Sequence, residues 1–153
     1  MTRLKAASSF PLKADRAHWH AAICGVLDLM TRSARHRSFS VADVERLILP
    51  PMLADQAVVL ADESSRIVAY GSIGLLTDEA AQGYIEGARK LQPGDWNAGD
   101  QVWLMDAIAP FGHARQLTTA IRSLARERGH AGRYICFRRT YPDGTHRISK
   151  ALL

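Results

Sequence analysis

Hydrophobic residues recur with a helical period in four stretches of the chain. Between Arg16 and Ser33 they fall three or four positions apart, which predicts an amphipathic helix. The same period predicts three more helices, over residues 40–49, 81–91 and 113–129. The helix over 40–49 is expected to begin with a Ser40 cap and to stop at Pro50-Pro51, because proline disrupts a helix interior.

Runs rich in β-branched and aromatic residues alternate with these helices and predict strands. They cover residues 56–62, 66–74, 102–110, 133–141 and 146–153. The first two runs are separated by the polar sequence DESS, and the last two by Pro142-Asp143-Gly144. Each of these pairs is therefore expected to form a hairpin. The run over 102–110 is the strongest strand signal in the chain.

A carboxylate interrupts this strongest strand. On a regular strand, side chains alternate between two faces, so Asp106 is expected to share a face with Leu104 and Ile108. An ionised carboxylate among aliphatic groups is costly unless it is paired or hydrogen-bonded. Asp106 therefore needs a partner, which is either an arginine of the basic C-terminal part, for a structural role, or a histidine, for a functional one.

The order of elements predicts a single α/β domain with a mixed, mostly antiparallel sheet flanked by helices. With 153 residues, the chain is long enough for one domain with a substantial core. We expect that domain to span residues 1–153, with residues 1–14 as a loose lead-in.

The net charge of +5 is concentrated near the C-terminus. Residues 1–109 hold 11 Lys and Arg against 13 Asp and Glu, whereas residues 110–153 hold 9 against 2. This asymmetry favours an acidic partner for the C-terminal part. Aromatic residues do not cluster with the arginines, which disfavours a nucleic-acid module. No apolar run reaches the roughly 18 to 20 residues of a membrane span, and no Cys/His spacing suits a metal ion.

His36 lies in a short charged segment after the first helix, between Arg35 and Arg37. Histidine is the side chain best suited to act as a base near neutral pH. The alternative is an ordinary solvated loop histidine. Local sequence does not decide between the two.

A second candidate region begins where the strand over 102–110 ends. Phe111 and Gly112 lead into a helix whose N-terminal amides could bind a phosphate. Arg115, Arg122 and Arg126 form a narrow stripe on that helix. The stripe is either a solvated face or a docking strip for an acidic carrier protein. The sequence FGHARQ lacks the Gln/Arg-x-x-Gly-x-Gly/Ala pattern with which acetyltransferases hold coenzyme A.

Several motifs match one enzyme family in order and spacing. They are Ser33-x-x-His36-Arg37, Leu49-Pro50, Val68-Ala69-Tyr70, Asp95-Trp96-x-x-Gly99-Asp100 and Trp103-x-x-Asp106-x-Ile108-Ala109-Pro110-Phe111-Gly112. With these motifs the chain resembles the toxin-activating lysine acyltransferases of the RTX systems over most of its length. The resemblance implies an acetyltransferase-like (GNAT-like) fold, with which the predicted element order is compatible.

The resemblance also implies an activity. Family members work in the cytoplasm and transfer a fatty acyl group from acyl carrier protein to internal lysines of an RTX-type protein, without a tightly bound cofactor. It assigns catalytic roles to His36 and Asp106, with Ser33 assisting. Phe111, Gly112 and the arginine stripe would then face the donor. The family also permits a homodimer.

This chain departs from the family pattern near the histidine. Ala34 and Arg35 stand where the family often has Pro-Leu, and Phe39 and Ala107 each replace a frequent tryptophan. The acyl pocket and the target are therefore expected to differ. Two other functions remain open: a coenzyme-A-dependent N-acyltransferase of the same fold, and a non-catalytic basic chaperone or binding protein. Direct acyl transfer and an acyl-histidine intermediate are both compatible with the sequence.

Overall fold

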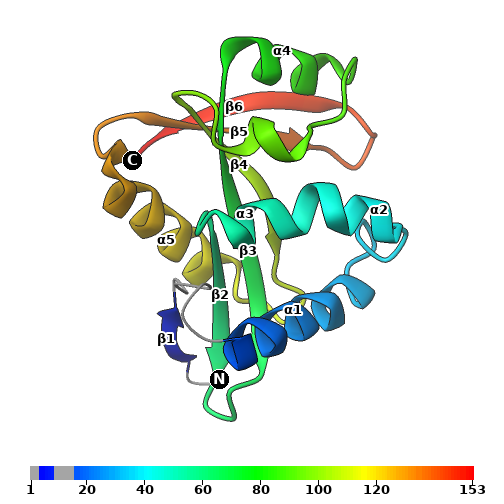
Figure 1. Ribbon diagram of the computed structural model, residues 1–153, viewed down its shortest axis with the longest axis vertical. Coiled ribbons are helices and arrows are strands. Elements are labelled where there is room, and N and C mark those ends of the chain that lie inside the picture. The colour runs from blue at the N-terminus through cyan, green and yellow to red at the C-terminus, as the bar shows by residue number, and fades with distance from the viewer. Residues whose placement is uncertain (1–3, 9–15) are drawn as a thin grey trace.

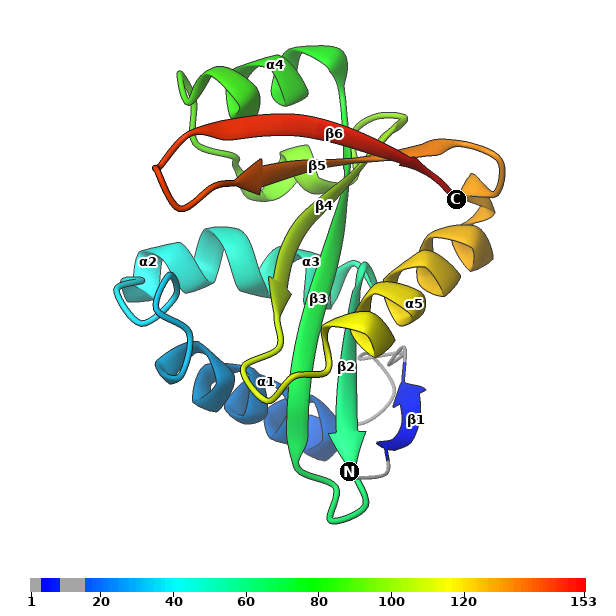
Figure 2. The ribbon, with the colours of Figure 1, turned by 180° about the vertical axis from the view of Figure 1, so that it is seen from behind.

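A computed structural model describes residues 4–8 and 16–153 and shows one sheet with helices on both faces (Figures 1 and 2). The strands are β1 Leu4–Ser8, β2 Ala57–Asp62, β3 Ile67–Leu76, β4 Gln101–Ile108, β5 Tyr134–Thr140 and β6 His146–Leu152. The helices are α1 Arg16–Thr31, α2 Val41–Asp43, α3 Leu49–Leu53, α4 Asp78–Glu86 and α5 Ala114–Ala125. Shorter helical turns are η1 Val44–Ile48, η2 Pro93–Trp96 and η3 Arg126–His130.

The strands lie in the sheet in the order in which they occur in the chain. All neighbouring pairs are antiparallel except β4 and β5, which are parallel and are connected through α5. The expected mixed, mostly antiparallel sheet is confirmed, as are both hairpins. Among the described residues, no helix is long and apolar enough to cross a membrane.

Strand β1 was not expected. Its residues were assigned to a loose lead-in, yet they pair with β2 in antiparallel register. Their sequence shows no strand alternation, and the pairing depends on the free edge that β2 offers. The remaining lead-in residues, 1–3 and 9–14, lie outside the described residues.

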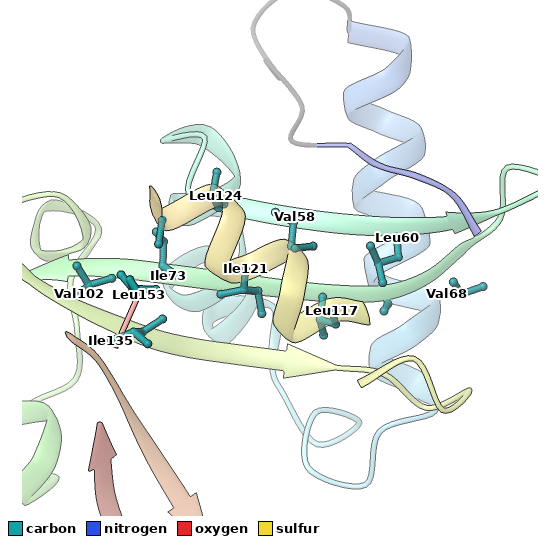
Figure 3. Close-up of a cluster of buried hydrophobic side chains, with 13 residues drawn as sticks. Val58, Leu60, Val68, Ile73, Val102, Leu117, Ile121, Leu124, Ile135 and Leu153 are labelled. Atoms are coloured by element: carbon teal, nitrogen blue, oxygen red, sulfur yellow. The ribbon is translucent and has the colours of Figure 1, made fainter. Parts of the chain in front are cut away.

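Two hydrophobic clusters hold the helices against opposite faces of the sheet. Helix α5 packs on one face through Leu117, Ile121 and Leu124 (Figure 3). A Cβ on Gly71 of β3 would lie only 2.5 Å from Ile121 Cδ1, so the glycine allows this helix to approach the strand closely. Helices α1 and α3 cover the other face through a second cluster that includes Val26 (Figure 1).

The prediction that Pro50 and Pro51 end the second helix is wrong. The helix continues through η1 and α3 to Leu53. Because Pro50 has no N–H, the carbonyl of Arg46 loses its helical partner. The indole Nε1 of Trp96 donates to that carbonyl instead, at 3.0 Å. A side chain 50 residues away therefore compensates for the proline.

Candidate active site

His36 is buried in a tight turn between α1 and α2. The amides of His36 and Arg37 both donate to the Ser33 carbonyl, and the Phe39 amide donates to the His36 carbonyl. The Phe39 ring lies 4.9 Å from the imidazole, centroid to centroid, and His36 is only 4% exposed. The histidine is therefore not a solvated loop residue.

A β-bulge in β4 determines where Asp106 points. Asp106 pairs with Ser72 and Leu104 pairs with Ile73, so Met105 has no partner across the strands. An extra residue of this kind reverses the alternation beyond it. The expectation that Leu104 and Asp106 share a face is therefore wrong, because Leu104 packs towards α5 and Asp106 contacts His36.

Three side chains form a continuous hydrogen-bonded chain. Ser33 Oγ lies 2.7 Å from His36 Nδ1, and His36 Nε2 lies 2.9 Å from Asp106 Oδ1. A carboxylate can only accept, so Nε2 carries the proton and donates it, and Nδ1 accepts from the Ser33 hydroxyl. Asp106 is 6% exposed, and the histidine supplies the partner that a buried carboxylate requires.

Arg35 and two tyrosines surround this chain. Arg35 Nη2 lies 4.0 Å from Asp106 Oδ1. Burial raises the pKa of Tyr70 above its ordinary range, and the nearby Asp106 carboxylate adds to that shift. Burial likewise raises the pKa of Tyr84, which Arg35 opposes. Both phenols are therefore neutral near pH 7 and can donate hydrogen bonds.

A cavity of about 550 Å³ opens on the opposite face of β4. Strands β4 and β5 pair only over Val102–Leu104 and then diverge (Figure 2). Leu104, Ala107 and Ala109 of β4 line the cavity, together with side chains of α5, β5 and β6. The lining is mostly apolar. Among the described residues that line it, Arg122 and Arg139 carry a charge. The size lies within the usual range for small-molecule sites.

A second hollow, of about 450 Å³, adjoins the histidine. It lies between α1 and the helix that begins at α2, and its lining includes His36, Arg37 and Phe39. His36 is absent from the lining of the first cavity. The two hollows therefore lie on different sides of β4, and His36 lines only the second.

The residues expected to face the donor do not form one surface. Gly112 has a φ of 86°, a conformation that favours glycine, and it turns the chain after β4. The Phe111 ring lies under two guanidinium groups, those of Arg32 and Arg66, at 5.7 and 4.9 Å from its centroid. It is thus held beside α1 and outside the lining of the 550 Å³ cavity.

The arginine stripe on α5 is divided in a similar way. Arg115 and Arg126 are exposed. Arg122 is half-buried, donates to the Leu152 carbonyl and lines the cavity. Two of the three arginines are therefore free to meet a partner, whereas the third ties α5 to β6.

Comparison with known proteins identifies the family of this chain. The model of the HlyC RTX toxin acyltransferase family matches residues 16–148. The chain belongs to this family. It is similar to the lysine-acyltransferase RtxC of Vibrio cholerae, with 32% identity over 100 residues that cover 65% of either chain.

Two other curated relatives of this acyltransferase family show comparable similarity. The RTX-II toxin-activating lysine-acyltransferase ApxIIC of Actinobacillus pleuropneumoniae is 37% identical over 94 residues, covering 61% of this chain and 58% of the relative. The protein-lysine myristoyltransferase RtxC of Kingella kingae is 33% identical over 96 residues, covering 63% and 57%. The aligned part thus spans less than two thirds of each relative.

Membership of the RTX toxin acyltransferase family confirms the resemblance inferred from the motifs. Sequence reasoning still missed Arg35 and Tyr84 as neighbours of Asp106. For Arg35 a signal existed, because a charged residue stands where the family often has leucine. For Tyr84 there was none, because its helical spacing indicated only a core position.

Proposed function

We propose that the protein is a protein-lysine fatty acyltransferase that transfers an acyl group from acyl carrier protein to an internal lysine of an RTX-type protein. The observation that carries this proposal is the hydrogen-bonded chain of Ser33, His36 and Asp106. It joins a turn and a strand that are 70 residues apart in sequence. A buried carboxylate that orients a histidine is an arrangement suited to general base catalysis.

In this mechanism His36 acts as a base and does not become acylated. One ring nitrogen faces Asp106 and the other faces Ser33, so neither is open to an incoming carbonyl carbon. The lysine Nζ, as the neutral amine, attacks the thioester carbonyl, forming a C–N bond. Ser33 Oγ accepts a proton from the amine as it gives its own to Nδ1. The C–S bond then breaks, and the thiolate recovers the proton from the imidazolium.

The donor fits the 550 Å³ cavity between β4, β5 and α5. Its apolar lining suits an acyl chain or pantetheine arm, and Arg122 and Arg139 add positive charge for a phosphate. Parallel strands that diverge beside a helix N-terminus are also what an acetyltransferase-like (GNAT-like) fold requires. We assign the protein to that fold and the cavity to the donor.

Acyl carrier protein is favoured over coenzyme A as the donor. The exposed Arg115 and Arg126 offer positive charge to an acidic carrier, and the coenzyme A pattern is missing from FGHARQ. A non-catalytic chaperone would need no hydrogen-bonded Ser33–His36–Asp106 chain, which disfavours that alternative. We further propose that the enzyme works in the cytoplasm and can form a homodimer.

The decisive experiment is co-expression with an RTX-type protein, followed by intact-mass and peptide mass spectrometry. We expect a lysine-linked fatty acyl group that disappears in His36→Ala and persists in His20→Ala, a control on the exposed face of α1. The purified enzyme, given acyl carrier protein or coenzyme A thioesters in separate reactions, identifies the donor. An acyl group on the enzyme itself after incubation with donor alone would refute direct transfer.

A further inference from the structure

The two hollows give the two substrates of an acyl transfer separate approaches. The aliphatic cavity lies on the α5 side of β4, whereas His36 lines only the hollow on the other side. A nucleophile must reach the imidazole chain to lose its proton. If the donor fills the first cavity, as proposed above, the lysine of the protein substrate approaches from the His36 side of β4.

Two cations lie beside the histidine on this side of β4, Arg35 next to Asp106 and Arg37 at the hollow. The Arg35 side chain is 66% exposed, although its guanidinium lies 4.0 Å from Asp106. Arg37 is exposed, lines the hollow and forms no ion pair with any residue that the structure describes. Asp43, in the first turn of the neighbouring helix, is already bonded to Arg46 and Ser40.

This charge is unfavourable for a lysine that arrives alone. An ammonium that approaches His36 is repelled by the positive charge of Arg35 and Arg37, and the repulsion is stronger where the surroundings exclude water. A carboxylate close to the lysine in the same segment reverses the balance, because guanidinium groups bind carboxylates through charge-assisted hydrogen bonds. The apolar side chains in the hollow, Leu27, Met30 and Phe39, would accept a neighbouring aliphatic residue.

We propose that Arg35, with Arg37, selects a target lysine that has a carboxylate within about two residues of it in the substrate. The inference rests on the proposed function for the identity of the nucleophile. The chemical class of the substrate segment is thus acidic and partly aliphatic around the lysine.

The test uses three fluorescein-labelled peptides with one central lysine that differ only in the two flanking residues: Glu, Gln or Arg. Anisotropy measures their binding to the full-length protein. We expect the Glu peptide to bind about tenfold more tightly than the Gln peptide, and the Arg peptide more weakly than both. Arg35→Leu should reduce the Glu preference to less than threefold, and Arg35→Glu should reverse it. Arg16→Leu, which removes an exposed cation at the start of α1, should leave it unchanged.

Equal affinity of the wild-type protein for the Glu and Gln peptides would overturn the inference. An unchanged preference in Arg35→Leu, together with a raised KM for myristoyl-acyl carrier protein, would assign Arg35 to the donor and overturn it as well. Turnover of the same peptides is measured separately. A Glu preference in binding that depends on Arg35, without any acyl transfer, would reject the proposed function and support this inference.

Discussion

Replacing Asp106 with asparagine tests the electrostatic part of the mechanism. The substitution keeps the shape of the side chain and leaves an amide oxygen that can accept from His36 Nε2. It removes the negative charge that lies 2.9 Å from that nitrogen. We therefore expect the fold to survive and the stabilisation of the imidazolium to be lost.

The size of the effect follows from this distance. Two unit charges at this separation interact by about 6 kcal/mol with an effective dielectric constant of ~20. In the transition state the imidazole carries part of the full charge, so about half of this energy, ~3 kcal/mol, is lost. The rate of acyl transfer should then fall by about 10²-fold.

The assay measures initial rates of lysine acylation with myristoyl-acyl carrier protein, and circular dichroism checks the fold. Because Asp106 and His36 act as one unit, the double variant should be little slower than His36→Ala alone. The reasoning is refuted if folded Asp106→Asn keeps more than a third of the wild-type rate. It is also refuted if the two substitutions reduce the rate by independent factors.

Three more predictions concern stability, pH and docking. Gly99→Ala should destabilise the fold by about 3 kcal/mol in denaturant titrations, because the new Cβ would lie 2.3 Å from a backbone oxygen of β3. Gly94→Ala is the control and should be neutral, because a Cβ at that position meets open space. Equal stability of the two variants would contradict this prediction. The pKa of Asp43 is lowered from 3.8 to about 2 by the cap hydrogen bonds at the start of α2, so its stabilisation is present above pH 4 and disappears as the pH falls towards 2. Asp43→Asn should therefore be less stable than wild type at pH 7, and the difference should vanish as the pH falls from 4 towards 2. A stability difference that does not change with pH would disprove the stabilising role of the Asp43 carboxylate. The double variant Arg115→Glu/Arg126→Glu should raise KM for the acyl carrier donor about tenfold and leave KM for a short acyl-pantetheine unchanged. Equal effects on both donors would exclude docking of the carrier protein on these arginines.

The elements with a clear period could be predicted from the sequence, and so could the pairing of His36 with Asp106. The hairpins follow from polar turns between β-branched runs, which are local signals. The pair follows from the motifs of the family together with the need of a buried carboxylate for a partner. Confirmation came from the 2.9 Å contact between the two side chains.

Features that depend on distant contacts could not be predicted. The helix passes Pro50 because the Trp96 indole satisfies the carbonyl that the proline leaves free, and no local pattern indicates this. The bulge at Met105 arises from the pairing of β4 with β3, and it changes which side chains lie beside Asp106. Strand β1 likewise depends on the edge of β2.

The bulge has an evolutionary consequence. Beyond Met105, Ala107 and Ala109 face the cavity while Asp106 faces His36. A substitution at Ala107 can therefore change the volume of the cavity without altering the face that carries the His36–Asp106 pair. Substitutions around Arg35 can change the surface beside Asp106 without altering the cavity on the opposite face of β4. Under the proposed function, one strand would thus let preferences for acyl chain and for target diverge independently among descendants of the same protein.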